Sequence, residues 1–138
     1  RVFCATSGAS RVSTTKPGKE GAAMSKESAL LVDYKYCSGC HSCEVACKNE
    51  HGFGVGVYGI KVLEMPPMKM GEGMTDAWDW IYLPVPTALC DHCAARLEAG
   101  EKPTCVKHCQ SFCLEFGTLA DMQARAAELD HKVAVFLP

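Results

Sequence analysis

Four cysteines stand close together in the first half of the chain, at a spacing that suits one kind of metal group. They are Cys37, Cys40, Cys43 and Cys47, in the pattern C-x2-C-x2-C-x3-C. Two intervening residues let successive thiolates turn inward around one small object, and this spacing is typical of proteins that bind 4Fe–4S clusters. Cys47 stands one helical turn beyond Cys43 and should point away from the loop. In ferredoxins with two clusters the last cysteine of this pattern binds the other cluster, so the pattern predicts two clusters.

A second cysteine region supplies the other thiolates. It contains Cys90, Cys93, Cys105 and Cys109, and the eleven residues 94–104 stand where the first region has a two-residue spacer. A folded excursion must return Cys105 to the site, and Cys109 then repeats the displaced position of Cys47. We predict these two sets of ligands: Cys37, Cys40, Cys43 and Cys109 for cluster 1, and Cys47, Cys90, Cys93 and Cys105 for cluster 2. Neither set is complete without both regions, so we expect folding and cluster binding to be coupled.

Zinc and disulfide bonds are the alternative uses of so many cysteines. Structural zinc also takes four thiolates, in a zinc-binding interaction module, but its motifs usually come as two C-x2-C pairs separated by a longer span. Here four cysteines lie within eleven residues. A disulfide framework requires an oxidising compartment. Residues 1–23 contain no Leu or Ile and no apolar run typical of a secretory signal, so we expect a cytoplasmic protein with reduced thiols.

Other residues near the two motifs are rival ligands. Cys113 follows Cys109 at the spacing at which Cys109 follows Cys105. We expect Cys113 to be a buried free thiol, because its use in place of Cys109 would lengthen the gap after Cys105 to seven residues, two turns, and carry the thiolate too far along the same helix. The histidines beside cysteines would suit a Rieske centre, in which histidine replaces two cysteines. Since eight cysteines already complete two clusters, we expect these histidines to surround the ligands or to face solvent: His41, His92 and His108.

Composition and charge exclude several functions. The chain has 138 residues, enough for one domain with a modest core, and no run approaches the roughly 20 apolar residues of a membrane helix. The first 23 residues carry a net charge of +3 and the remainder carries −5, which favours a cationic protein partner over nucleic acid. We find no nucleophile with a base, no phosphate loop and no paired carboxylates, so we expect an electron carrier without an active site of its own.

Short strands and helices are predicted around the two cysteine regions, in an α+β fold. Residues 1–23, which include Cys4, have the Ser-, Thr-, Gly- and Lys-rich composition of a disordered leader, and we expect the domain to span residues 24–138. Apolar patterns predict strands at 29–34, 58–65, 80–85 and 132–137, and Pro84 and Pro86 are expected to end the third. Helices are predicted around 44–48 and over 119–129, the latter begun by Thr118 and Asp121. The Pro-, Gly- and Met-rich segment 65–75 is predicted to be a loop.

The cysteine motifs resemble the iron–sulfur subunits that accompany molybdopterin oxidoreductases of the dimethyl sulfoxide reductase group. The resemblance covers roughly residues 29–118, and its specific parts are C-x2-C-x2-C-x3-C-K-N-E-H from Cys37 and L-C-D-H-C followed by P-T-C-V-K-H-C, ending at Cys109. Two features depart from that family. Residues 48–89 contain no cysteine, so the middle motifs of the four-cluster members are missing, and Gln110 stands where proline usually follows the last ligand.

That resemblance implies a ferredoxin-like domain with two 4Fe–4S clusters, docked on a large catalytic subunit that contains a molybdenum or tungsten pterin. It also implies transfer of electrons between that subunit and an external carrier. A free-standing ferredoxin that serves several enzymes is the alternative within the same class.

Two further groups of side chains have a functional and a structural interpretation. The first group consists of cationic side chains near the cysteines, which would either tune the reduction potentials of the clusters or be ordinary surface residues. They are Lys35, Lys48, Arg96 and Lys107. The second group is a Met- and Trp-rich segment, which would either form a surface for a partner protein or fold onto a small core. Its residues are Met65, Met68, Met70, Met74, Trp78 and Trp80.

Overall fold

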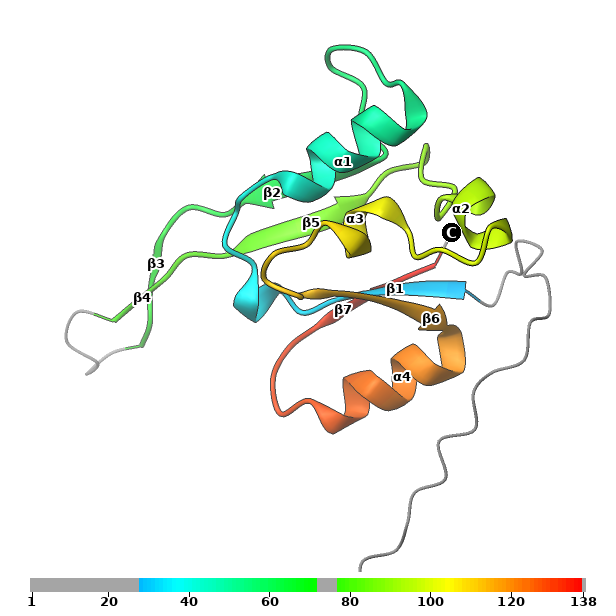
Figure 1. The fold of residues 1–138 in the computed structure, drawn as a ribbon. Helices are drawn as coiled ribbons and strands as arrows, with labels where there is room; N and C mark the ends of the chain where they lie inside the picture. Colours follow the sequence, from blue (N-terminus) through cyan, green and yellow to red (C-terminus); the bar gives the residue numbers. More distant parts are fainter. Residues whose placement is uncertain (1–27, 72–76, 138) are drawn as a thin grey trace, which may run out of the picture.

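The computed structural model describes residues 28–71 and 77–137 (Figure 1). The predicted leader with Cys4 and the methionine Met74 lie outside the described residues. Within them, the chain forms a mixed α+β fold with four α-helices and three small antiparallel sheets. The α+β prediction is therefore confirmed.

Strand β1 (Ser28–Val32) is the centre of the three-stranded sheet. It pairs antiparallel with β6 (Leu114–Thr118) on one side and with β7 (Ala134–Phe136) on the other. Residues 29–32 are at most 2% exposed, because side chains on both faces of this strand are covered. Side chains of a strand alternate between its faces. Leu30 and Val32 pack with the cysteine-bearing half of the molecule, and the intervening Leu31 packs with α4 (Leu119–Glu128).

Helix α4 covers the face of this sheet that is remote from the cysteines (Figure 1). It begins at the predicted place, because the Thr118 hydroxyl accepts a hydrogen bond from the backbone N–H of Asp121 at 3.2 Å. Met122 on this helix is buried against Ala29 and Leu31. This half of the molecule is a small apolar core that anchors β1.

The opposite face of the sheet carries the cysteine regions. After β1 the chain makes one 3-10 turn, η1 (Tyr34–Tyr36), and then α1 (Ser42–His51), which packs against α3 (Thr104–Lys107). The excursion between Cys93 and Cys105 contains α2 (Ala94–Glu98). Beside α1 lies a two-stranded sheet of β2 (Ile60–Glu64) and β5 (Tyr82–Pro86).

A narrow ribbon extends this two-stranded sheet away from the body of the molecule (Figure 1). The Met65 N–H donates to the Ile81 carbonyl at 2.9 Å, and beyond it β3 (Met68–Lys69) pairs with β4 (Trp78–Asp79). We call residues 65–71 and 77–81 the arm. Residues 65–75 were predicted to be a loop, which is wrong at β3, and β4 was not predicted, because the predicted strand began only at residue 80.

Two other strands differ from the expectations from sequence. Strand β6 was not predicted, although Leu114 and Phe116 alternate with polar or small residues along it. Pro84 does not end β5, which continues through it, whereas the strand does end at Pro86. Strand β5 pairs with β2 alone, and proline is tolerated on such an edge because no neighbouring strand requires its missing N–H.

Candidate metal centres

The first hollow lies between the loop that precedes α1 and the turn that follows α3. Five cysteines line it: Cys37, Cys40, Cys43, Cys109 and Cys113. Apolar side chains of β2, β5 and β6 form one side of it, through Val62, Pro84 and Leu114. The structure thus gathers the four cysteines predicted to hold cluster 1, and adds Cys113 to them.

The loop around the first hollow needs left-handed backbone at two positions. Gly39 has a φ of 66°, and His41, directly before α1, has a φ of 59°. A Cβ atom on Gly39 would lie 2.6 Å from the ring of Tyr82. Glycine is therefore required at position 39 by conformation and by space, and its absence of a side chain lets the loop close against β5.

The second hollow lies between the end of α1, the Cys90 turn and the start of α3. Its four cysteines are the set predicted for cluster 2: Cys47, Cys90, Cys93 and Cys105. Leu30, Ile60 and Phe116 give it an apolar wall that belongs to the core of the domain. The backbone turns through left-handed conformations at His92 and Cys93, with φ values of 55° and 57°.

Both hollows take side chains from the same two chain segments. Cys43 and Cys47 stand one turn apart on α1, yet Cys43 lines the first hollow and Cys47 the second. Cys105 on α3 lines the second hollow, and Cys109, just beyond the end of α3, lines the first. This exchange of one cysteine in each direction is the arrangement that the spacing predicted. The role of these residues as metal ligands stays a prediction.

Burial controls the acidity of most of these thiols. It raises the pKa of Cys43 to about 12 and that of Cys47 to about 11. The pKa values of Cys90, Cys93 and Cys105 are also raised, again chiefly by burial. Such thiols hold their protons unless a cation lies against the sulfur, and a coordinating metal deprotonates a thiol outright. Metal loading of either hollow should therefore release protons.

Cys113 lies inside the first hollow, in contact with two predicted ligands. Its S–H donates to Cys37, and this hydrogen bond lowers the pKa of Cys37 to about 6 while the pKa of Cys113 is raised. The Sγ atoms of Cys109 and Cys113 are 3.4 Å apart. Cys113 is buried, as expected, but the reason given for excluding it as a ligand is wrong. Helix α3 ends at Lys107, so the chain turns back after Cys109 and does not carry Cys113 away.

Three side chains beside the second hollow could hold a single metal ion. The ligand atoms of His51, Asp91 and Cys93 all lie within 4.8 Å of one another. His51 Nε2 is 3.5 Å from Cys93 Sγ, and Asp91 Oδ1 accepts the backbone N–H of Cys93 at 2.8 Å. Sequence reasoning missed His51 and Asp91. The available signal was that His51 stands four residues, one helical turn, beyond Cys47 on the same helix.

The histidines considered for a Rieske centre have other surroundings. His108 Nδ1 lies 2.9 Å from the Thr104 carbonyl oxygen, and His41 Nδ1 lies 3.3 Å from Glu44 Oε1. His92 is 4% exposed and lines the second hollow. Its Nε2 has no hydrogen-bond partner among the described residues. A buried polar atom without a partner is unusual, and an absent group that accepts a hydrogen bond would account for it.

Both hollows therefore fit metal groups held by thiolates. Each offers four sulfur ligands in apolar surroundings, and the second also contains the unpartnered Nε2 of His92. The two hollows also resemble each other in their lining of four or more thiols beside apolar side chains, which suits two groups of the same kind.

The cationic side chains proposed to tune the sites contact other parts of the fold. Lys48 Nζ donates to the carbonyl oxygens of Gly54 and Val57, at 2.7 and 3.0 Å, and so holds the loop after α1. Arg96 on α2 pairs with Glu50 on α1 at 3.0 Å. None of these four cations lines either hollow: Lys35, Lys48, Arg96 and Lys107. The contacts favour a structural role for Lys48 and Arg96.

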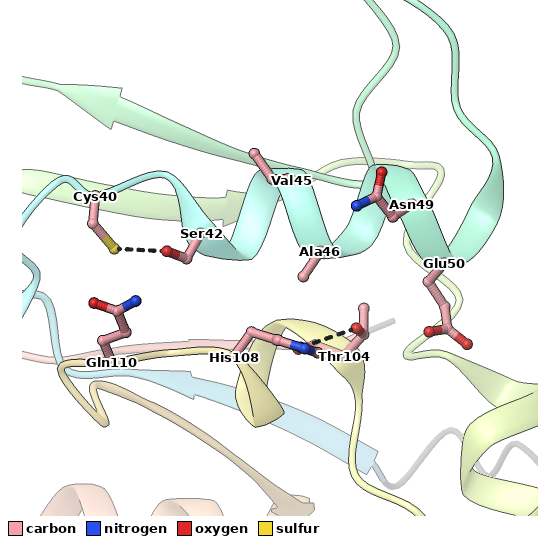
Figure 2. Close-up of a pocket in the computed structure, with 9 residues that line it drawn as sticks. All are labelled: Cys40, Ser42, Val45, Ala46, Asn49, Glu50, Thr104, His108 and Gln110. Carbon is pink, nitrogen blue, oxygen red and sulfur yellow. Dashed lines mark hydrogen bonds between the residues drawn. The ribbon is translucent and has the colours of Figure 1, made fainter.

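An open groove runs along the outer side of the molecule between α1 and α3 (Figure 2). Cys40 lies at one end of it, where its Sγ is 3.4 Å from the Ser42 hydroxyl oxygen, and Glu50 lies at the other end. Cys40 is exposed and also lines the first hollow. The first hollow therefore reaches the protein surface at Cys40.

Large apolar side chains cover the arm. Trp78 and Trp80 are 60% and 55% exposed, and Met65, Met68 and Met70 are between 41% and 47% exposed. The Trp80 ring stacks on Tyr82 and its Nε1 donates to Glu64 at 3.0 Å. Both tryptophans are more than half exposed, so the interpretation in which they fold onto a small core is wrong, while the partner surface stays a prediction.

No family model matches the chain, and no curated protein matches it either. None of the helices in residues 28–71 and 77–137 has the length and apolar character to cross a membrane.

Proposed function

We propose that this chain carries two 4Fe–4S clusters and transfers electrons as the small subunit of a larger oxidoreductase. The observation that carries the proposal is the exchange of cysteines between the two hollows, each lined by four thiols of the predicted set. This pairing is the pattern of two-cluster ferredoxins, and a pair of isolated zinc sites gives no reason for it. The proposal includes the finer assignment of the α+β fold as ferredoxin-like.

The surroundings of the two sites suit electron transfer. A cluster held by Cys37, Cys40, Cys43 and Cys109, and one held by Cys47, Cys90, Cys93 and Cys105, would each supply one-electron transfer. Both sites take a cysteine from α1 and one from α3 or the turn directly after it, so they lie side by side, and the buried side chains of Leu30 and Ile60 line the second. Cys40 brings the first site to the surface, where an electron can enter or leave.

The proposed partner is a large catalytic subunit with a molybdenum or tungsten pterin, with an external electron carrier as the second contact. The support is the resemblance of the cysteine motifs together with the exposed arm. Aromatic side chains and methionines of this kind are enriched in the centres of protein interfaces. Thiolate sites also require reduced cysteines, so we place the protein in the cytoplasm.

Metal analysis of the anaerobically purified chain tests the proposal. We expect about eight iron and eight sulfide per chain, from two clusters. Cys43→Ala should remove the iron of the first site and Cys47→Ala that of the second, although these residues are neighbours on one helix. Zinc in place of iron and sulfide would overturn the proposal. Purification of the tagged chain from its own host, followed by pterin analysis of the proteins bound to it, tests the partner.

A single metal ion at His51, Asp91 and Cys93 is the second candidate, and the short distances among their ligand atoms favour it. A single ion at this place excludes cluster 2, because the ion and the cluster would both need Cys93 as a ligand. The two are separated by His51→Gln, which should abolish a site for one zinc ion but should leave the iron and sulfide content of a cluster unchanged.

A further inference from the structure

We propose that Cys113 is a second fourth ligand of the first site, interchangeable with Cys109. This inference rests on the proposed function, since it concerns the group that the first hollow would hold. It extends that function, because the first site then has five thiols for the four ligand positions of a cluster. The second site has four thiols for its four ligand positions.

The position of Cys113 supports the exchange. Its Sγ lies 3.4 Å from that of Cys109, so either sulfur reaches the same part of the hollow with a small side-chain rotation. Cys113 and Cys37 line the same hollow from opposite segments of the chain. The Cys113 thiol therefore lies among the four predicted ligands, and it can replace one of them as long as the backbone keeps it there.

The backbone around Cys113 is held in place at some conformational cost. Phe112 has a φ of 52°, which is an outlier for a bulky side chain, and its ring is 84% exposed. Packing of the ring therefore does not compensate for this conformation. The Phe112 N–H donates to the Cys109 carbonyl at 3.3 Å, and the Asp33 N–H donates to the Cys113 carbonyl at 2.8 Å. These bonds fold the segment back so that both sulfurs face one hollow, and such strained residues concentrate at functional sites.

The exchange needs no oxidant or reductant. The bond from the Cys109 sulfur to iron breaks and a bond from the Cys113 sulfur forms, while the proton of the Cys113 thiol passes to the freed thiolate of Cys109. Charge and proton count in the hollow stay the same. Because Cys113 is 3% exposed, the proton passes between neighbouring sulfurs and not through bulk water.

Iron and sulfide analysis of four anaerobically purified variants tests this inference, with paramagnetic resonance spectra of the reduced proteins. We expect Cys109→Ala to keep about eight iron atoms with altered resonance of the first cluster, and Cys113→Ala to keep about eight. The double variant C109A/C113A should lose iron from the first site. Cys40→Ala is the matched control, because its nearest described side-chain partner is the Ser42 hydroxyl and not a spare thiol, so it should lose iron as the double variant does.

Two results overturn the inference. One is an iron content of Cys109→Ala as low as that of Cys40→Ala, whether through loss of one cluster or failure to fold, since Cys113 then does not replace Cys109. The other is an equal iron content in Cys109→Ala and the double variant. Wild-type protein without iron and sulfide would instead contradict the proposed function, so the two failures are distinguishable.

Discussion

The carboxylate of Glu44 accepts a hydrogen bond from the backbone N–H of Val62 at 2.6 Å, which ties the first turn of α1 to the middle of β2. Lys61 Nζ lies 3.2 Å from the same carboxylate. Glu44 is 6% exposed and stands directly after Cys43. The contact therefore joins the helix that carries cysteines of both hollows to the two-stranded sheet that lines the first.

Substitution of Glu44 should destabilise the fold and make its stability less dependent on pH. Burial acts to raise the pKa of Glu44, but the Val62 N–H, Lys61 and His41 outweigh it and hold the pKa below its ordinary value of 4.5. A lowered pKa means that the ionised group stabilises the fold at pH above 4.5 and that this contribution is lost as the pH falls below it.

We expect Glu44→Ala to cost about 2 kcal/mol, because it leaves the buried N–H of Val62 without a partner. Glu44→Gln, which keeps an acceptor but not the charge, should cost less. Glu128→Ala is the control: this exposed residue on α4 pairs with Arg125, and its loss should change stability by at most about 0.5 kcal/mol. Urea unfolding under anaerobic conditions at several pH values measures these changes. A cost for Glu44→Ala no larger than for the control would contradict the role of this contact.

His131 should make stability fall as the pH rises above 6.5. Hydrogen bonds to Asp130 first, and to Asp33 second, raise the pKa of His131 above its ordinary value of 6.5. A raised pKa means that the protonated ring stabilises the fold fully below pH 6.5, and that this contribution is lost as the pH rises through the raised value. The Asp33 contact, at 2.9 Å, joins the segment before β7 to the end of β1.

Two variants check the assignment to His131. The midpoint of thermal unfolding of His131→Gln should vary less with pH above 6.5 than that of the wild type. Asp130→Asn removes the largest cause of the shift, so its loss of stability should begin at lower pH than in the wild type. If both variants follow the wild-type curve, another group is responsible.

The sequence predicted those elements whose signal is local. The apolar run at residues 29–32 identifies β1, and Thr118 with Asp121 marks the start of α4, because each signal lies within the element itself. Strand β6 was missed because it forms by pairing with β1, more than 80 positions earlier in the chain. Its five residues include Glu115 and Gly117, which weaken any local preference for a strand.

In the candidate site, too, the features with a local signal were predicted from the sequence and those that depend on the fold were not. The membership of the two hollows followed from spacing, because a C-x2-C pair and a cysteine one turn later constrain where sulfurs can point. The nearness of Cys113 did not follow, because it depends on the end of α3 at Lys107 and on the left-handed Phe112. The group of His51, Asp91 and Cys93 joins residues from two regions and is visible only in the fold.

The arm should contribute binding energy for the large subunit. Trp78 is 60% exposed on β4, and replacing a tryptophan that is a hot spot of an interface costs about 2 kcal/mol or more, about a 30-fold loss of affinity. We expect Trp78→Lys to reduce co-purification of the pterin protein without changing the iron content. Val55→Lys is the control, because Val55 is an exposed apolar residue in the loop after α1, away from the arm. Equal recovery of the partner with both variants would exclude the arm from the interface.

Gly59 should be needed for metal binding at the second hollow but not for the metal-free fold. A Cβ atom at this position would lie 2.7 Å from Cys47 Sγ and 3.1 Å from the ring of Phe53. Without metal, the Cys47 sulfur can rotate away from an alanine at little cost. As a ligand it is fixed, so the clash must be relieved by displacing the ligand or the backbone before β2. Changes that disturb the support of ligands typically reduce metal affinity by about 10- to 100-fold.

We therefore expect Gly59→Ala to lower the iron content from about eight toward about four atoms per chain, with the resonance of the first cluster retained. Gly54→Ala is the matched control, because a Cβ atom at Gly54 meets nothing within 4 Å, and it should keep the wild-type iron content. Urea unfolding of the chelated proteins provides the second measurement, in which Gly59→Ala should resemble the wild type. Full iron in Gly59→Ala would show that Cys47 is free to move when the site is loaded, and would remove Cys47 from the ligand set.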